Sequence, residues 1–314
     1  MRRNEGKIFV STTTAELEDD PPSFAADCSA SITAIAPWFG SKRTLAPAIV
    51  EELGPHRKYD EVFCGSCAVL LAKKPSSFET VNDLHGELIN LARCLKDESL
   101  SVVLYARLSR TLMHEGLFHE AAERWRERGN VPATDEPDLD RAEDYMLCAW
   151  FGRNGVAGTS SYNQGFCVRY TKNGGHAGKR WTSAVDSIPD WHDRLKAVTI
   201  LNRDGFELLE RLEDAEGCAI YCDPPYLVKG AKYVHDFASE DHDRLAKLVS
   251  RFKRTRVVVS YYDHERLADL YPGWRKRRID VTKAMVNQGM RDKSGATKVT
   301  EVLLVNDKDT RLFQ

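Results

Sequence analysis

Apolar positions recur along the first third of the chain at helical and strand spacings. Leu45, Ile49 and Leu53 lie on one face of a helix, and short apolar runs follow, bounded by glycine or charged residues. A strand, a tight turn, a helix and a second strand in this order predict a βαβ unit with parallel strands. The predicted elements are a helix over residues 44–53, a strand over 59–63, a helix over 68–73, a strand over 79–82 and a helix over 87–95.

The α/β pattern stops after residue 99 and returns near residue 198. Residues 100–152 carry helical spacings, broken at 129–140 by a linker rich in proline and acidic residues. Residues 152–181 are rich in glycine, lysine and arginine and have no clear periodicity. The elements predicted after this interruption are a strand over 198–201, a helix over 206–212, a strand over 218–222, a helix over 241–252, a strand over 256–261 and a strand over 298–305.

These elements predict one α/β domain with a mixed, mainly parallel sheet. It is built from residues 31–99 and 191–314, and a mostly helical insert at 100–190 divides it. Residues 1–30 are polar, with an acidic run followed by two prolines, and we expect a flexible tail there.

Composition narrows the class of protein only slightly. The formal net charge of -2 favours no nucleic-acid partner, so any basic surface must be local. No apolar run is long enough for a transmembrane helix, and no apolar stretch after the N-terminus resembles a secretory signal. The eight cysteines are sparse for a disulfide scaffold, so we expect reduced thiols, a cytoplasmic location and no membrane contact.

The most informative segment for chemistry follows the apolar strand at 218–222. There Asp223, Pro224, Pro225 and Tyr226 lie where ligands bind in open parallel sheets, outside the carboxyl end of a strand. The prolines stiffen the loop, so a carboxylate and a carbonyl can each accept a hydrogen from an adenine amino group and free its lone pair for attack on a methyl sulfonium. Tyr226 offers a stacking face for an extruded base. The structural alternative is a plain Pro-Pro turn after a core strand.

Two earlier segments point toward a bound cofactor. A glycine-containing turn follows the first strand at Gly65, which lets a ligand approach the backbone, and Asp83 follows the second strand, where an acid can bind ribose hydroxyls. Each signal is weak alone. A third segment, Trp38-Phe39-Gly40-Ser41-Lys42, precedes the first helix. Taken singly, Lys42 is better explained as a solvated surface lysine, and Asp83 as a helix N-cap.

Taken in order, these segments resemble the DNA adenine methylase family, the amino-methyltransferases whose cofactor motif precedes the Asp-Pro-Pro-Tyr motif. The resemblance covers about residues 32–305, and Ser41 and Cys67 stand where the family has glycines. Both replacements are small and would narrow the cofactor pocket. The matching segments are Trp38-Phe39-Gly40-Ser41-Lys42, Phe63-Cys64-Gly65-Ser66-Cys67, Asp83-Leu84-His85 with Leu88-Ile89-Asn90, Arg153-Asn154-Gly155, Asp204-Gly205-Phe206 and Asp223-Pro224-Pro225-Tyr226.

The resemblance implies a Rossmann-like S-adenosylmethionine-dependent methyltransferase sheet with an inserted target-recognition domain. It implies methyl transfer from S-adenosylmethionine to N6 of a flipped-out adenine in double-stranded DNA, without a metal. Asp223, Pro224, Pro225 and Tyr226 would form the catalytic segment, with Asp223 also beside the cofactor and Asp204 facing the cofactor adenine. The cofactor-binding residues that it implies are Trp38, Gly40, Lys42, Phe63, Gly65, Ser66, Asp83, Asp204, Phe206 and Asp223.

We expect sequence recognition in residues 152–181, because arginine and lysine suit guanine edges and asparagine suits adenine edges. The alternative is a surface loop without that role. The basic runs at 251–256 and 275–278 are expected to be solvated faces, although the second precedes a short β-like segment at 278–281 and could contact phosphates. The predicted nucleic-acid contacts are Arg153, Asn154, Asn163, Arg169, Lys172, Lys179 and Arg180.

Several rival interpretations remain open from sequence. Cys64 and Cys67 flank two residues between a strand and a helix, which is also the setting of a thioredoxin-like redox motif. The sequence favours a zinc site even less. No second cysteine pair follows Cys64 and Cys67 at the spacing of zinc ligands, and His235 and His242 lie in a helical or loop setting. Methylation of cytosine N4 or of RNA, and a catalytically inactive DNA-binding homologue, also fit. A cognate restriction endonuclease leaves no trace in one chain.

Overall fold

The computed structural model describes residues 33–38, 40–129, 131–152, 165–167, 176–227, 235–282 and 298–307. The predicted flexible tail at 1–30 lies outside these residues. The described strands form one seven-stranded sheet in the order β3-β2-β1-β4-β5-β7-β6. The strands are β1 (Lys58–Glu61), β2 (Phe78–Asn82), β3 (Thr199–Leu201), β4 (Cys218–Cys222), β5 (Arg256–Tyr262), β6 (Arg275–Thr282) and β7 (Lys298–Val305).

The sheet is mixed and mainly parallel, as the sequence predicted. β1 pairs in parallel with β2 and β4, β2 with β3, and β4 with β5, whereas β7 runs antiparallel to both β5 and β6. Because β1 and β4 are adjacent in the sheet but distant in sequence, the chain reverses direction across the sheet between them. Ligand sites of open α/β sheets form at such a reversal, outside the carboxyl ends of the strands.

Helices cover both faces of the sheet, and the alternating side chains of each strand divide between two cores. On β4, Ala219 and Tyr221 join one core, while Ile220 and Cys222 join the other. The first core contains side chains of α1, α2 and α3, and the second contains those of α9, α10 and α11. These helices are α1 (Ala46–Leu53, after a 3₁₀ turn at Lys42–Thr44), α2 (Ala68–Ala72), α3 (Gly86–Lys96), α9 (Gly205–Arg211), α10 (Ser239–Val249) and α11 (Leu267–Leu270).

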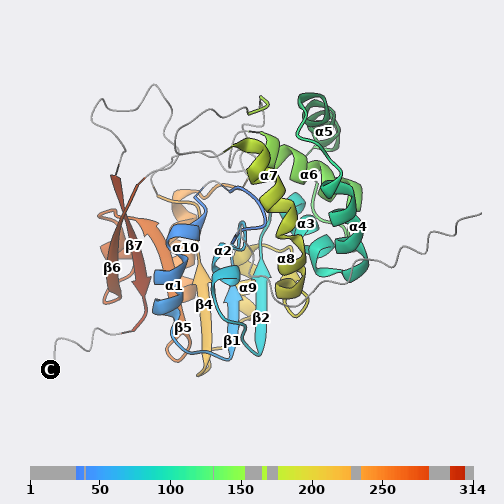
Figure 1. Ribbon diagram of the computed structural model, residues 1–314. Coiled ribbons are helices and arrows are strands. Elements are labelled where there is room, and N and C mark those ends of the chain that lie inside the picture. The colour runs from blue at the N-terminus through green and yellow to red at the C-terminus, as the bar shows by residue number, and fades with distance from the viewer. Residues whose placement is uncertain are drawn as a thin grey trace, which may run out of the picture.

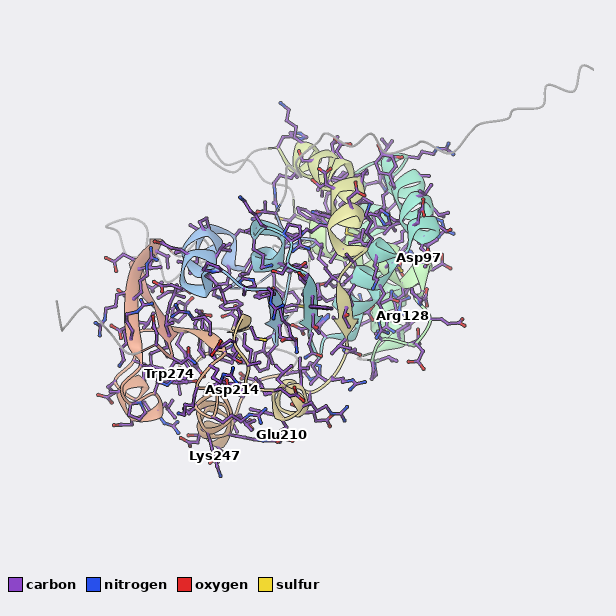
Figure 2. All side chains as sticks on the ribbon, turned by 90° about the horizontal axis from the view of Figure 1, so that it is seen from below. Asp97, Arg128, Glu210, Asp214, Lys247 and Trp274 are labelled. Atoms are coloured by element: carbon purple, nitrogen blue, oxygen red, sulfur yellow. The ribbon has the colours of Figure 1, made fainter. Side chains whose placement is uncertain are left out.

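Five further helices gather on the β3 and β2 side of the sheet, away from β6 and β7 (Figure 1). Asp97 and Arg128 mark this helical end in Figure 2, and Trp274 marks the opposite one. The buried side chains of these five helices belong to the same core as those of α1, α2 and α3 and do not form a separate core. The predicted division of the chain into a catalytic domain and an insert stays a prediction. The five helices are α4 (Glu98–Ser109), α5 (Glu115–Arg128), α6 (Leu139–Phe151), α7 (Ala177–Asp186) and α8 (Ile188–Leu195).

Several regions differ from the sequence prediction, among them the short helix α11, which was not predicted. β6 is longer than the short segment predicted at 278–281, because all of its residues pair with β7. Helices α7 and α8 were not predicted, although Trp181, Ala184 and Val185 have helical spacing and are buried. The predicted boundary at residue 190 falls inside α8. No helix in the described part of the chain is both long and apolar enough to cross a membrane.

Candidate active site

Predicted site residues gather at the carboxyl ends of β1, β2 and β4, and Ser260, which was not predicted, joins them from β5. Phe63 and Gly65 follow β1, Asp83 follows β2, Asp223 follows β4, and Ser260 lies near the end of β5. Each group belongs to a different segment of sequence, and the parallel register brings them to one edge of the sheet.

Hydrogen bonds fix the Asp223 carboxylate through both of its oxygens. Ser260 Oγ donates to Oδ1 at 2.7 Å, and Lys42 Nζ lies 2.8 Å from Oδ2. Ser260 is itself fully buried, and its Oγ lies 2.9 Å from the hydroxyl of Tyr221. Tyr221, Ser260 and Asp223 therefore form a buried hydrogen-bonded chain that ends on the carboxylate.

Lys42 is buried rather than a solvated surface lysine, with 5% of its side chain exposed. Its ammonium donates to the carbonyl of Gly40 at 2.8 Å and lies 3.9 Å from Glu301 Oε2. Burial pulls the pKa of Lys42 down, but the charges of Asp223 and Glu301 outweigh it and raise the pKa. Lys42 therefore stays charged beside the Asp223 carboxylate.

Tyr226 is held beside the carboxylate by contacts at both ends of its side chain. Its hydroxyl donates to Glu301 Oε2 at 3.0 Å, and Lys42 Nζ lies 5.0 Å from its ring centroid. The ring of Tyr262 meets it edge-on at 4.5 Å. Pro224 is buried and Pro225 is half-buried between Asp223 and Tyr226, so the whole tetrapeptide is set against the sheet edge rather than forming a free turn.

The loops after β1 and β2 are tied together by Asp83. Its Oδ2 accepts from Gly65 N at 2.8 Å and its Oδ1 from His85 N at 2.9 Å. Burial raises the pKa of Asp83, although these backbone donors oppose the shift. Asp83 is not the N-cap of α3, because the His85 side chain fills that role by accepting from Leu88 N. A carboxylate has about four acceptor positions, so Asp83 keeps acceptor capacity for a ligand.

Gly65 has a positive φ of 46°, and a Cβ there would lie 2.8 Å from Trp38 Nε1. The indole of Trp38 therefore lies directly over the turn, and only glycine fits beneath it. Ser41 and Ser66 meet through their hydroxyls at 3.2 Å. Trp38 thus lies against Gly65, and Ser41, the neighbour of Lys42, lies against Ser66. Cofactor binding by these residues stays a prediction.

Cys67 occupies the position of a family glycine and adopts the left-handed conformation, with a φ of 58°. Among the residues described, it is the sole non-glycine with a positive φ. Cys64 and Cys67 are buried free thiols. The hydrogen bond with Cys67, together with burial, raises the pKa of Cys64 well above its usual value. Redox cysteines need a stabilised thiolate, so this environment opposes the thioredoxin-like alternative.

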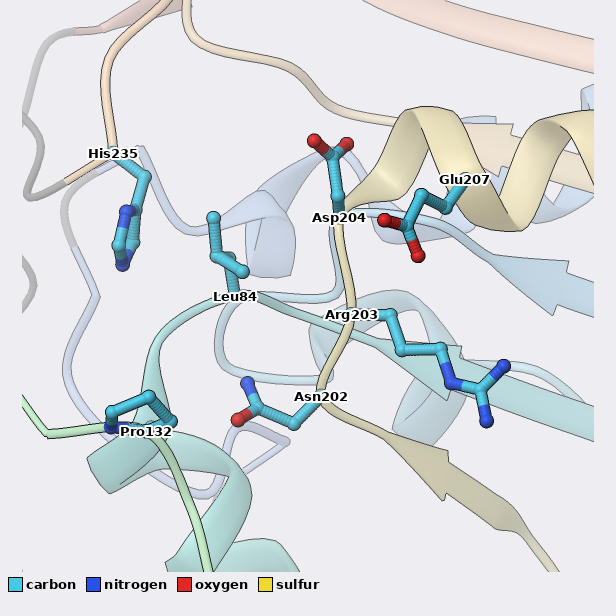
Figure 3. Close-up of a pocket in the computed structure, with 8 residues that line it drawn as sticks. Leu84, Pro132, Asn202, Arg203, Asp204, Glu207 and His235 are labelled. Atoms are coloured by element: carbon cyan, nitrogen blue, oxygen red, sulfur yellow. The ribbon is translucent and has the colours of Figure 1, made fainter.

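A cavity of about 420 Å³ opens beside these loops (Figure 3). It falls in the size range of small-molecule sites. Asp204 and Glu207 line it from the start of α9, and His235 and Pro132 face them (Figure 3). The remaining lining residues are Leu84, Gly86, Asn202 and Arg203. Neither Asp83 nor Asp223 lines the cavity.

Aromatic rings pack behind Asp204, which caps α9 by accepting from Phe206 N at 2.7 Å. Phe206 stacks on Phe237 with ring centroids 5.3 Å apart, and Phe63 meets Phe237 edge-on at 5.7 Å. Phe63 and Phe206 therefore lie in one cluster beside the cavity, but they belong to its supporting layer rather than to its lining.

The structure describes only two of the predicted nucleic-acid contacts. Lys179 is exposed on α7, and the guanidinium of Arg180 lies 5.7 Å from the ring centroid of Trp150. The other five, Arg153, Asn154, Asn163, Arg169 and Lys172, lie outside the described residues.

The basic run at 275–278 is engaged within the protein. Arg275 Nη2 lies 2.5 Å from Glu52, Arg277 Nη1 lies 2.7 Å from Glu51, and Arg278 Nε donates to Asp263 at 2.9 Å. These ion pairs join β6 to α1 and to the segment after β5. They favour a structural role for the run over phosphate contacts.

In the other run, Arg251 donates to the carbonyls of Leu209 and Leu212. His242, weighed earlier as a metal ligand, lies with Nδ1 3.0 Å from the Tyr261 hydroxyl. Within the described ranges, no three His, Cys, Asp or Glu side chains are grouped as metal ligands.

Sequence reasoning missed several residues at the site, among them Ser260, Tyr262, Glu301 and Pro132. Ser260 and Tyr262 lie at the carboxyl end of β5, so the rule that located Asp223 could have located them. Glu301 lies in antiparallel β7 and Pro132 in a distant linker, and no local signal marks either.

Comparison with known proteins agrees with this geometry. The family model described as D12 class N6 adenine-specific DNA methyltransferase matches residues 38–288. The chain is also similar to the Retron Ec67 DNA adenine methylase of Escherichia coli, with 23% identity over 280 residues, which cover 88% of this chain and 92% of that protein. The resemblance inferred from the motifs is therefore confirmed.

Proposed function

The chain belongs to the D12 class N6 adenine-specific DNA methyltransferase family, and from this premise we propose that it uses S-adenosylmethionine and the Asp223–Tyr226 segment to methylate adenine. When bound, S-adenosylmethionine supplies an electrophilic methyl group on a sulfonium. The observation that carries the proposal is the Asp223 carboxylate, fixed by Lys42 and Ser260 beside the ring of Tyr226.

The residues around the cavity suit this cofactor. The Gly65 turn leaves no room for a side chain beneath Trp38, so the indole covers the turn and is held beside the cofactor site. Asp83 offers acceptors for ribose hydroxyls, and Asp204 faces the cavity where a donor such as an adenine amino group could bind (Figure 3). In this arrangement Trp38, Gly40, Lys42 and Ser66 would close the side of the site nearest Asp223.

Asp223 acts on the target amino group. Adenine N6 is a poor nucleophile because its lone pair is delocalised into the ring. A carboxylate oxygen of Asp223 and the carbonyl of Pro224 each accept one N6 hydrogen, which draws the nitrogen toward tetrahedral geometry. Methyl transfer to N6 would convert bound S-adenosylmethionine to S-adenosylhomocysteine, and the proton that N6 loses would pass to water. Lys42 and Ser260 hold the carboxylate in place, so little reorganisation is required.

Tyr226 supplies the binding face for the target base in this proposal. A base inside a duplex cannot reach Asp223, so the adenine leaves the stack and packs on the tyrosine ring. The bond from Tyr226 to Glu301 and the contact with Tyr262 fix the ring plane before the base arrives.

We also propose that residues 152–181 read the target sequence, with Lys179 and Arg180 at their α7 end. Arg169→Ala or Arg180→Ala should relax or change the methylated sequence at a cost of about 1–3 kcal/mol for each lost base contact. A contact to phosphate alone would weaken binding to all sequences alike and lower its salt dependence. Sequencing that detects modified adenines in genomic DNA separates the two results.

The chemistry is tested by digesting methylated duplex DNA to nucleosides after incubation with S-adenosylmethionine. N6-methyldeoxyadenosine is expected, whereas N4-methyldeoxycytidine would contradict the adenine assignment. Asp223→Ala should lower the rate about 100- to 1000-fold, because N6 loses its charged acceptor. Asp193→Ala, which removes an exposed carboxylate on α8, is the control. An Asp223→Ala rate within threefold of the wild type would refute the proposed role.

A further inference from the structure

One wall of the cavity comes from the linker between α5 and α6, far in sequence from the other walls. We call residues 131–133 the strap. Pro132 of the strap faces Asn202 and Leu84 across the cavity (Figure 3). The strap belongs to the stretch predicted as the insert, whereas the other lining residues belong to the catalytic part of the chain.

Arg141 holds the strap from beneath. This residue of α6 is 3% exposed, and its guanidinium donates to the carbonyls of Val131 at 2.5 Å and Pro132 at 3.0 Å. Its Nε donates to Glu87 Oε2 at 2.8 Å. One buried side chain therefore joins two consecutive strap carbonyls to the first turn of α3.

The strap is also bound on its other side. Asn202 Oδ1 accepts from Ala133 N at 3.1 Å, while Asn202 Nδ2 donates to the carbonyl of Asp83 at 2.8 Å. A Cβ at Gly86 would lie 2.4 Å from the Val131 carbonyl oxygen. The strap therefore rests directly on the start of α3, without room for an intervening side chain.

The buried Arg141–Glu87 ion pair contributes little net stability. Both side chains are buried, and desolvation of two charges offsets much of their attraction. Burial raises the pKa of Glu87, although Arg141 opposes the shift. Such a pair fixes geometry more effectively than it adds stability, and the geometry that it fixes here is the position of the strap against the cavity.

We propose that Arg141 is a positioning residue for the cofactor, which holds the strap as a wall of the cavity and so couples the helices at this end of the molecule to cofactor affinity. This inference rests on the proposed use of S-adenosylmethionine at this cavity. Arg141 does not line the cavity, so its effect on the cofactor is transmitted through the strap backbone.

The test is calorimetric titration of the full-length protein with S-adenosylmethionine, together with steady-state kinetics on duplex DNA. Arg141→Met should raise the Kd and KM for S-adenosylmethionine about tenfold, a typical size for coupling between sites, and leave kcat within about threefold. Arg141→Lys keeps the charge and can bond one strap carbonyl, so it should recover part of the affinity.

The matched control is Arg124→Met. Arg124 on α5 pairs with Asp144 on α6 at 2.6 Å and does not contact the strap. A purely structural role for these arginines would lower the melting temperature of both variants and leave both Kd values unchanged. The inference expects the Kd to rise only for Arg141→Met.

A folded Arg141→Met protein with wild-type affinity would overturn the inference. If that variant does not fold, Arg141→Lys takes its place, because it can bond only one of the two strap carbonyls that Arg141 bonds. A wild-type Kd for folded Arg141→Lys would overturn the inference in the same way. Failure of the wild type itself to bind S-adenosylmethionine would overturn the proposed cofactor, and the inference with it. Wild-type binding with unaltered variant affinity would overturn the inference alone.

Discussion

Ser260 is the residue whose replacement tests the arrangement around Asp223 most directly. Ser260→Ala removes the donor to Asp223 Oδ1, which lies 2.7 Å from Ser260 Oγ. It also leaves the buried hydroxyl of Tyr221 without its partner at 2.9 Å. Lys42 then remains as the contact that holds the carboxylate, through Oδ2.

A hydrogen bond to a charged group contributes about 1.5–3 kcal/mol, so we expect a loss of about 10- to 100-fold in kcat if that contribution is realised mainly in the transition state. The KM for S-adenosylmethionine should change little, because Ser260 does not line the cavity proposed for this cofactor. Tyr221→Phe is the matched control. It removes the outer hydroxyl of the chain but keeps the Ser260 donor, so its loss of kcat should be clearly smaller.

The assay is transfer of a radiolabelled methyl group to duplex DNA at saturating cofactor, with circular dichroism to confirm folding. A Ser260→Ala protein with kcat within twofold of the wild type would show that Lys42 alone orients Asp223. Equal losses for Ser260→Ala and Tyr221→Phe would place the effect in core packing instead of in the carboxylate.

Three further predictions concern buried groups. Burial raises the pKa of Glu61 to about 8. The protonated side chain therefore contributes its full stability below the ordinary carboxyl pKa, and this contribution is lost as the pH rises from there to about 8. In urea denaturation, the unfolding free energy of Glu61→Gln should fall less than that of the wild type across this pH range. Glu79→Gln should lower the unfolding free energy by about 3–5 kcal/mol, because two basic partners lose their buried counter-charge; a loss under about 1 kcal/mol in denaturant titration would contradict this. Iodoacetamide should modify partly exposed Cys218 well before buried Cys64 and Cys67 in the native protein, as peptide mass spectrometry can measure.

The sequence alone determined the α/β class and most elements of the sheet. The strands over 218–222 and 298–305 were predicted with their observed bounds, because unbroken apolar or alternating runs between turn residues allow few other structures. It also placed Gly65, Asp83 and Asp223 at the carboxyl ends of parallel strands, where ligands bind in such sheets, whereas Lys42 was singled out only by the family resemblance. Helices α7 and α8 were not predicted as separate elements, because the glycine-rich stretch before them obscured their short apolar repeats.

Only the tertiary structure decided which residues complete the site. Glu301 reaches Tyr226 from an antiparallel strand, and the strap reaches the cavity from a linker bonded by Arg141. Neither position has a local signal, because hydrogen bonds between segments far apart in sequence depend on how the chain closes and not on neighbouring residues. Likewise, only the tertiary structure shows that the arginines of the basic run at 275–278, which could have contacted phosphates, form ion pairs within the protein. Its carboxylate partners on α1 lie more than two hundred residues earlier in the chain, a separation that no periodicity or motif spans.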